Sequence, residues 1–139
     1  MFNFRFKLRE DDPRAVRLRS NFVFKIIPML NPDGVILGNY RCGLSGVDLN
    51  RQWHDANEAR MPTIFHTKRL LKSLAASDQL MLFCDLHGHS RKHNVFCYGC
   101  ENNRDNSRAK YQEMVFPRLL WRNCPVFSFS DCSFKVPPP

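Results

Sequence analysis

The feature that most constrains this chain is a short apolar run that ends in a carboxylate and two histidines, LFCDLHGHS at residues 82–90. In an α/β protein, a buried strand delivers functional groups at its carboxyl end, where the backbone leaves the sheet. There, the imidazole of His87 can face a metal ion while the nearby carboxylate of Asp85 orients it. A polar loop after a core strand has the same pattern, and these residues alone leave both interpretations open.

Length and composition indicate one globular domain. The 139 residues are 43% hydrophobic, which argues against wholesale disorder. The net charge of +8, from 21 Lys and Arg against 13 Asp and Glu, favours acidic partners such as nucleic acid, an anionic membrane surface or an acidic peptide. No run approaches the roughly 20 apolar residues of a membrane span. Residues 1–9 alternate apolar and polar side chains, so we expect neither a signal peptide nor a membrane protein.

The six cysteines are expected to be ordinary reduced thiols. The even number permits disulfides, but no secretory signal indicates an oxidising compartment. Residues 97–100 (CYGC) have the C-x-x-C spacing of redox and zinc sites, without a second C-x-x-C in the chain. The cysteine pattern therefore predicts a cytoplasmic protein.

Hydrophobic periodicity predicts the class α/β, with a mixed, mostly parallel sheet flanked by helices. Proline and acidic residues mark the helix starts, and apolar runs mark the strands. The predicted elements are a strand over 2–8, a helix over 13–19, a buried strand over 21–30, a long loop over 35–53, a helix over 62–76, a strand over 79–86, a strand over 94–98, a helix over 106–121 kinked or split at Pro117, and a strand over 126–136.

The loop over 35–53 is the second candidate for function. It follows a predicted turn at residues 31–34 (NPDG), where Pro fixes φ and Asp-Gly permits a tight reversal. The loop carries Arg41, Asn50 and Arg51, and a long Gly-containing loop with arginines in a compact domain is usually functional or disordered. We expect it to be functional, although an arginine taken alone is most often a solvated surface charge.

Several separated motifs resemble one family. The motifs are 24–35 (FKIIPMLNPDGV), 38–42 (GNYRC), 48–53 (DLNRQW), 83–92 (FCDLHGHSRK) and 127–136 (FSFSDCSFKV). In these motifs the chain is similar to the cytosolic carboxypeptidases, zinc metallocarboxypeptidases that remove glutamates from protein tails, notably those of tubulin. The resemblance covers roughly residues 12–136, leaves 1–11 as a divergent N-terminal segment, and departs at Met61, where members often carry histidine. It implies an incomplete zinc-carboxypeptidase-like domain.

The resemblance implies a role for four residues. His87 matches the family's third zinc ligand. Asn50 and Arg51 match the pair that grips the terminal carboxylate of the substrate, for which the planar fork of arginine is suited. Arg41 matches the arginine that stabilises the oxyanion of the tetrahedral intermediate. The expected cofactor is zinc, and the net charge of +8 suits a polyglutamate substrate.

The 139 residues lack two parts of the family's site. The family's first two zinc ligands form a His-x-x-Glu before the FKIIP motif, and none of the five histidines here is followed by Glu at the third position. The family's catalytic glutamate, the general base for the zinc-bound water, follows the FKV motif, and here only prolines follow it. We therefore expect a truncated form that does not catalyse alone. Other residues could in principle replace the missing ligands, with His87 and His89 on one strand face or His54 and Glu58 on one helix, but nothing in the spacing demands it.

Two functions from different classes follow. The first is a zinc metallocarboxypeptidase-family chain of the protein-deglutamylase type, acting on acidic or polyglutamylated tails such as those of tubulin. The alternative is a non-catalytic binder of acidic peptide tails through Arg41, Asn50 and Arg51. Nucleic-acid binding is not expected, because the basic residues are scattered and no recognised motif accompanies them.

Overall fold

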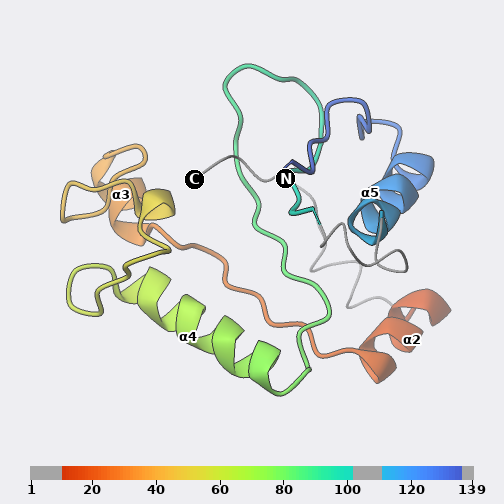
Figure 1. The fold of residues 1–139 in the computed structure, drawn as a ribbon, viewed down its shortest axis with the longest axis horizontal. Helices are drawn as coiled ribbons and strands as arrows, with labels where there is room; N and C mark the ends of the chain where they lie inside the picture. The colour runs from red at the N-terminus through yellow and green to blue at the C-terminus, as the bar shows by residue number, and fades with distance from the viewer. Residues whose placement is uncertain (1–10, 102–110, 136–139) are drawn as a thin grey trace. The chain divides into compact units, whose positions relative to one another are not determined.

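The computed structural model describes residues 11–101 and 111–135 (Figure 1). The chain divides into two compact units between Phe83 and Cys84. The first unit holds the helices α2, α3 and α4 and a 3-10 helix, η1. The second unit holds α5. The predicted strand over 2–8, the start of the predicted helix at 106–110 and the last residue of the predicted strand over 126–136 lie outside the described residues.

Proline begins three of the helices. α2 (Pro13–Asn21), α3 (Pro32–Leu37) and α4 (Pro62–Ala76) each have proline at the first turn, where its missing N–H costs no hydrogen bond. The predictions of α2 and α4 are confirmed, with α2 extending two residues beyond 19. Among the described residues α4 is the longest helix, at 15 residues, and none of the helices described is long and apolar enough to cross a membrane.

The start of α2 is capped by a carboxylate. Asp12 accepts a hydrogen bond from the Arg14 backbone N–H at 2.8 Å. The Arg14 guanidinium also binds this carboxylate, with 2.8 Å between Nη2 and Oδ2. These hydrogen bonds from Arg14 hold the pKa of the Asp12 carboxyl well below its usual range. Asp12 therefore stays ionised and caps the helix across the neutral pH range.

The predicted turn at residues 31–34 is instead the beginning of a helix, α3. The Asn31 side-chain oxygen accepts the Gly34 N–H at 3.0 Å, which is the geometry of a helix N-cap. Pro32 takes the first helical position. The prediction was wrong because Asn-Pro-Asp-Gly suits both a β-turn and a capped first turn, and residues 35–37 continue the helix.

The small core of the first unit lies under the loop after α3. Leu49, Met61 and Ile64 are buried, with Ile64 only 1% exposed. Val47, Trp53 and Ala56 pack against them. Met61, the position at which the resemblance departs, is thus a core residue.

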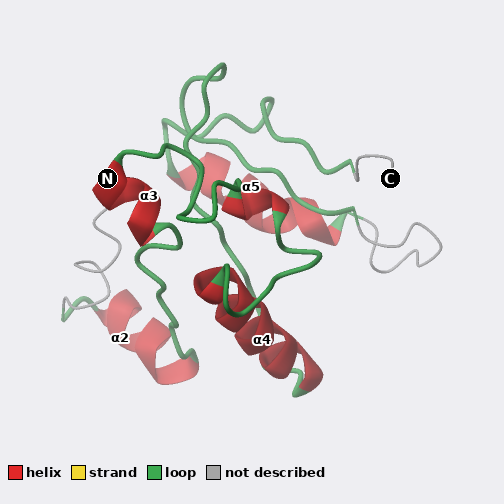
Figure 2. Ribbon diagram, turned by 90° about the vertical axis from the view of Figure 1, so that its left-hand side faces the viewer, coloured by secondary structure: helices red, strands yellow, loops and turns green. Residues whose placement is uncertain are grey.

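The two predicted central strands are not formed in the described residues, and the mixed, mostly parallel sheet is not confirmed. Residues 22–30 and 79–86 carry no regular secondary structure, and Figure 2 shows helices and loops in the described part of the chain. Val23 is 86% exposed and Leu86 is 90% exposed. The apolar sequence favours an extended chain, but a strand also needs a hydrogen-bonded neighbour, and no described residue pairs with either segment in a β-bridge.

The second unit pairs its other two predicted strands only at isolated points. Val95 bridges Phe127 and Tyr98 bridges Ser133, both in parallel register. The segments over 94–98 and 126–135 are therefore neighbours, but they form isolated bridges rather than the predicted strands. The predicted helix over 106–121 is confirmed from Gln112, as α5 (Gln112–Asn123), which continues through the buried Pro117 and is not split there.

Candidate functional site

A tight loop carries Arg41, predicted to stabilise the oxyanion, and Asn50 and Arg51, predicted to bind the substrate carboxylate. Cys42 and Asp48 form an antiparallel bridge, and the Gly43 N–H donates to the Val47 carbonyl at 3.1 Å. In that register Arg41 lies opposite Leu49, the residue before Asn50. We call residues 41–51 the arginine loop, because Arg41 stands at one end and Arg51 at the other.

The arginine loop is fixed to helix α3 by one side chain. The Asn31 Nδ2 donates to the Cys42 carbonyl at 3.3 Å while its oxygen caps the helix. Gly34 is buried beside this contact. A Cβ at Gly34 would collide with the Asn31 amide and lie 2.8 Å from the Cys42 carbonyl oxygen. Asn31 therefore joins the two segments only because residue 34 has no side chain.

The second end of the arginine loop is the 3-10 helix η1 (Leu49–Arg51). Asp48 caps it, since its carboxylate accepts the Asn50 N–H at 2.9 Å. Leu49 points into the core and is 8% exposed. The next two side chains, Asn50 and Arg51, are exposed. Burial of Leu49 thus fixes the direction in which Asn50 and Arg51 leave the surface.

Asn50 is oriented by Trp53. The indole Nε1 donates to the Asn50 side-chain oxygen at 3.0 Å. The indole ring also makes an edge contact with Phe83, with 6.4 Å between centroids. The Asn50 Nδ2 has no hydrogen-bond partner among the described residues, so it is a donor available to a ligand.

Both arginines are available to an anion. The Arg41 guanidinium lies over the Tyr40 ring, 5.6 Å from its centroid. In residues 11–101 and 111–135, no carboxylate lies within ion-pairing distance of Arg41 or Arg51. Two unneutralised guanidinium groups and one amide donor are the chemistry that binds a carboxylate through charge-assisted hydrogen bonds.

His87 belongs to the second unit, in a segment without regular secondary structure. Its Nε2 lies 3.6 Å from Asp85 Oδ2, so the two side chains are neighbours at a distance longer than a hydrogen bond. The His87 side chain is 47% exposed, so its imidazole is accessible to a ligand.

His89 is committed to the local fold. Its Nδ1 accepts the backbone N–H groups of Arg91 and Lys92 at 3.2 and 3.0 Å. Its ring meets Phe96 edge to face, with centroids 5.2 Å apart. The suggestion that His87 and His89 share a strand face is wrong, because residues 79–89 form no strand.

Lys92 connects the His87 segment to residues near the end of the described chain. Its ammonium donates to the Asp131 carbonyl at 2.7 Å. It also lies over the rings of Phe96 and Tyr98, at 4.9 and 5.5 Å from their centroids. These cation–π contacts hold a charged group in an aromatic setting and limit its movement.

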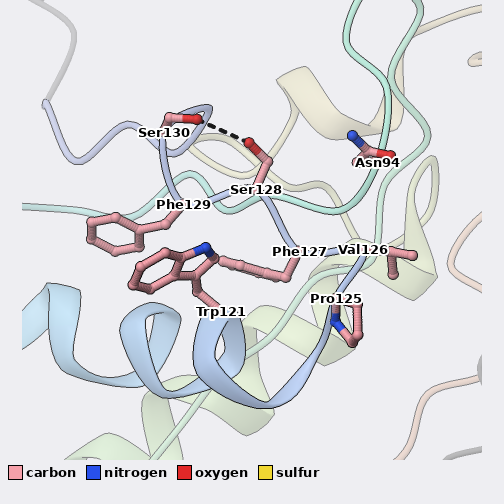
Figure 3. A pocket seen from close by; sticks show the side chains of 8 residues that line it. All are labelled: Asn94, Trp121, Pro125, Val126, Phe127, Ser128, Phe129 and Ser130. Atoms are coloured by element: carbon pink, nitrogen blue, oxygen red, sulfur yellow. Dashed lines mark hydrogen bonds between the residues drawn. The ribbon is translucent and has the colours of Figure 1, made fainter.

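The second unit also has an open pocket of about 440 Å³ between α5 and the segment after it (Figure 3). Trp121 and Phe129 contact each other there, with ring centroids 6.2 Å apart. The Ser128 and Ser130 hydroxyls are hydrogen-bonded at 3.1 Å. None of the four predicted site residues lines this pocket.

Comparison with known proteins identifies the family. The profile of the zinc carboxypeptidase family matches residues 3–119. The chain belongs to the zinc carboxypeptidase family. It is 50% identical over 127 residues to cytosolic carboxypeptidase 2 of Xenopus tropicalis, which covers 91% of this chain and 13% of that protein. It is 47% identical over 129 residues to cytosolic carboxypeptidase 3 of Mus musculus, which again covers 91% of this chain and 13% of that protein.

A third relative gives the same result. Cytosolic carboxypeptidase 1 of Mus musculus is 49% identical over 141 residues, with 93% of this chain and 12% of that protein covered. The chain therefore spans about an eighth of the length of the carboxypeptidases it matches.

The described residues do not fit a complete zinc site. A catalytic zinc ion takes three protein ligands and leaves one position open. Within residues 11–101 and 111–135, no three His, Cys, Asp or Glu side chains lie close enough to hold one metal ion. His87 lies 3.6 Å from Asp85, and no further described His, Cys, Asp or Glu side chain completes a metal-binding group with them.

The proposed substitute ligands His54 and Glu58 also do not form a pair on a helix. Residues 54–58 are not helical, and Glu58 Oε1 instead lies 3.5 Å from Nε2 of His66, on α4. The His54 carbonyl accepts a hydrogen bond from Lys68 at 2.7 Å, which ties this segment to the same helix.

The sequence motifs did not identify the residues that hold the arginine loop in place. These are Asn31, Asp48 and Trp53. Their signals were present: Asn before Pro is a helix-cap pattern, and Asp two residues before Asn50 is typical of a capped turn. Only the structure pairs the Trp53 indole with the Asn50 oxygen.

Proposed function

We propose that residues 12–136 form part of a carboxypeptidase catalytic domain that binds the acidic tail of a protein substrate. Asn50 and Arg51 grip the terminal carboxylate of the tail. Arg41 faces the carbonyl that becomes the oxyanion, and His87 supplies one zinc ligand. The substrate class is a glutamate-rich or polyglutamylated tail such as that of tubulin, and the compartment is the cytosol.

The proposal rests chiefly on the arginine loop. Arg41, Asn50 and Arg51 lie at its two ends, all three are exposed, and neither guanidinium is neutralised by a described carboxylate. The net charge of +8 supports an acidic substrate. The similarity to three cytosolic carboxypeptidases supports the reaction class of the whole protein.

The part assigned to this chain is substrate binding. Zinc supplies the activated water in this family, and the described residues offer His87 as one candidate ligand for it. Because no described group of three ligands surrounds a common point, we derive no hydrolytic step for these residues. The same observation favours a second candidate function, a non-catalytic binder of acidic tails through Arg41, Asn50 and Arg51.

Replacing Arg51 with alanine should weaken binding of a glutamate peptide about fivefold, or about 1 kcal/mol, because the lost contact is charge-assisted but exposed. Amidating the C-terminus of the peptide should weaken binding to the unmodified protein by a similar factor. Amidation should have little further effect on the Arg51→Ala variant, because both changes remove the same contact. The measurement is calorimetric titration of free and amidated peptides at two salt concentrations.

The matched control is Arg69→Ala, which removes an exposed arginine from α4 and leaves the arginine loop intact. It should retain the preference for the free carboxylate and lose only a little affinity at low salt, where general attraction is unscreened. If Arg51→Ala and Arg69→Ala behave alike with both peptides, the basic surface attracts anions without a carboxylate site.

The 139-residue polypeptide itself should neither retain zinc through dialysis nor release glutamate from a polyglutamate peptide. One imidazole cannot supply the chelation on which zinc sites depend. Zinc is measured by mass spectrometry of the dialysed protein, with His87→Ala as the reference for adventitious binding. Equimolar zinc in the unmodified protein, with glutamate release that a chelator stops, would refute this expectation and exclude the non-catalytic function.

A further inference from the structure

Two cysteines of the second unit lie opposite each other where its two extended segments meet. The Gly99 N–H donates to the Ser133 carbonyl at 2.9 Å, and the Ser133 N–H donates to the Cys97 carbonyl at 3.0 Å. The parallel register that pairs Tyr98 with Ser133 also sets Cys97 opposite Cys132. Neighbouring strands are about 4.8 Å apart, within the range of about 4.4–6.8 Å that disulfides span between Cα atoms.

The sulfur of Cys132 already contacts Cys97. It accepts the Cys97 backbone N–H at 3.2 Å and donates to the Ser128 carbonyl at 3.4 Å. Both cysteine side chains are partly buried and both are free thiols. Forming a bond between them therefore requires side-chain rotation rather than a rearrangement of the backbone.

We propose that Cys97 and Cys132 form a reversible redox pair, which hydrogen peroxide closes to a disulfide and small thiols reopen. The Cys132 thiolate attacks one peroxide oxygen, giving a sulfenic acid and, with one proton, water. The Cys97 sulfur then displaces the sulfenic hydroxyl, which leaves as a second water with the Cys97 proton. Two thiols thus lose two electrons to one peroxide molecule, and one S–S bond and two waters result.

The environment of Cys97 agrees with its role in the second step. Burial, followed by the nearby thiols of Cys132 and Cys84, raises the pKa of the Cys97 thiol. A thiol with a raised pKa is a poor first nucleophile at neutral pH, and it stays reduced until the neighbouring sulfur has been activated. The pair is therefore a dithiol under reducing conditions.

Closure would stiffen the part of the second unit that anchors Lys92. The bond joins residues 35 positions apart, and Asp131, whose carbonyl accepts Lys92, directly precedes Cys132. Removing the chain entropy of so long a loop from the unfolded state should raise the melting temperature of the oxidised protein by at least about 5 °C.

The test is peptide mapping of the full chain after treatment with hydrogen peroxide and blocking of free thiols with N-ethylmaleimide. We expect one intramolecular link, between Cys97 and Cys132, which dithiothreitol removes. Cys97→Ser and Cys132→Ser should not form it. Cys100→Ser is the matched control, because it removes an exposed cysteine three residues from Cys97 and should still form the link.

The mapping of the unmodified protein decides the matter even if a serine variant folds poorly. A link from Cys97 to Cys100 or to Cys84 would overturn the proposal, since each uses the same residue with a different partner. Conversion of Cys132 to sulfinic acid without a link, or links only between separate chains, would overturn it as well.

Discussion

Replacing Leu49 with alanine should lower the free energy of unfolding of the first unit by about 2–5 kcal/mol, the range for leucine-to-alanine changes in protein cores. Leu49 is 8% exposed and packs with Met61 and Ile64 in the small core of this unit. Because few side chains surround Leu49, the cavity left by the substitution would stay largely unfilled. A loss of this size approaches the whole stability of a small domain, so we expect much of the unit to unfold.

The same change should remove binding of glutamate peptides, because Leu49 directly precedes Asn50 and Arg51 in η1. The control is Leu44→Ala in the same loop, where the leucine is 69% exposed and its loss should change stability by no more than about 0.5 kcal/mol. Urea unfolding followed by Trp53 fluorescence measures both variants, with Trp121→Phe as a common background. Similar midpoints for the two variants would mean that Leu49 is not part of a core.

Replacing Gly34 with alanine should cost on the order of 2–3 kcal/mol, since it would break the helix cap and the hydrogen bond that join α3 to the arginine loop. The new Cβ would collide with the Asn31 amide and lie 2.8 Å from the Cys42 carbonyl oxygen. Alanine does favour a helix over glycine, by about 1 kcal/mol at most. The steric effect is larger, because the collision displaces a side chain that makes hydrogen bonds at both ends.

Gly88→Ala is the matched control, because nothing lies within 4 Å of a Cβ built there. It should melt within about 2 °C of the unmodified protein, while Gly34→Ala should melt at least about 8 °C lower. The variant Asn31→Ala separates the collision from the loss of the cap. Alone it removes the cap, and the double variant with Gly34→Ala should be only slightly less stable than Asn31→Ala. A fully additive double variant would show that the collision with Asn31 is not the source of the loss.

The helices were predictable from the sequence because their signals are local. Proline at positions 13 and 62 marks the first turns of α2 and α4, and the predicted end of α4 at Ala76 agrees with the structure. The helix α3 was missed for an equally local reason, since Asn31 and Pro32 can begin either a turn or a helix. Here the following residues, not the motif, decide between the two.

The strands were not predictable in the same way. The apolar run over 22–30 indicates a segment suited to a sheet, but whether a strand forms depends on a second segment that the run itself does not specify. The segments over 94–98 and 126–135 did find each other, through the bridges of Val95 and Tyr98. The hydrogen bond that holds the arginine loop to α3 likewise joins residues that are distant in the sequence, since Asn31 and Cys42 are eleven residues apart.

The candidate residues themselves came from motif resemblance, while their arrangement came from the structure. Arg41 and Arg51 occur in separate motifs, and the bridge between Cys42 and Asp48 places both on one loop. The role of Leu49 in that loop follows from burial, which its place in the DLNRQW motif does not reveal.

The exposed apolar segments over 22–30 and 79–86 bear on how long the polypeptide survives in a cell. Val23 and Leu86 are both more than four-fifths exposed and lie in segments without regular secondary structure. Chaperones and proteases bind exposed apolar segments of this kind. A polypeptide of these 139 residues should therefore turn over quickly, and its abundance should follow proteasome and chaperone capacity more closely than its rate of synthesis. Any ligand or neighbouring sequence that covers the two segments would lengthen its half-life before it changed any other property.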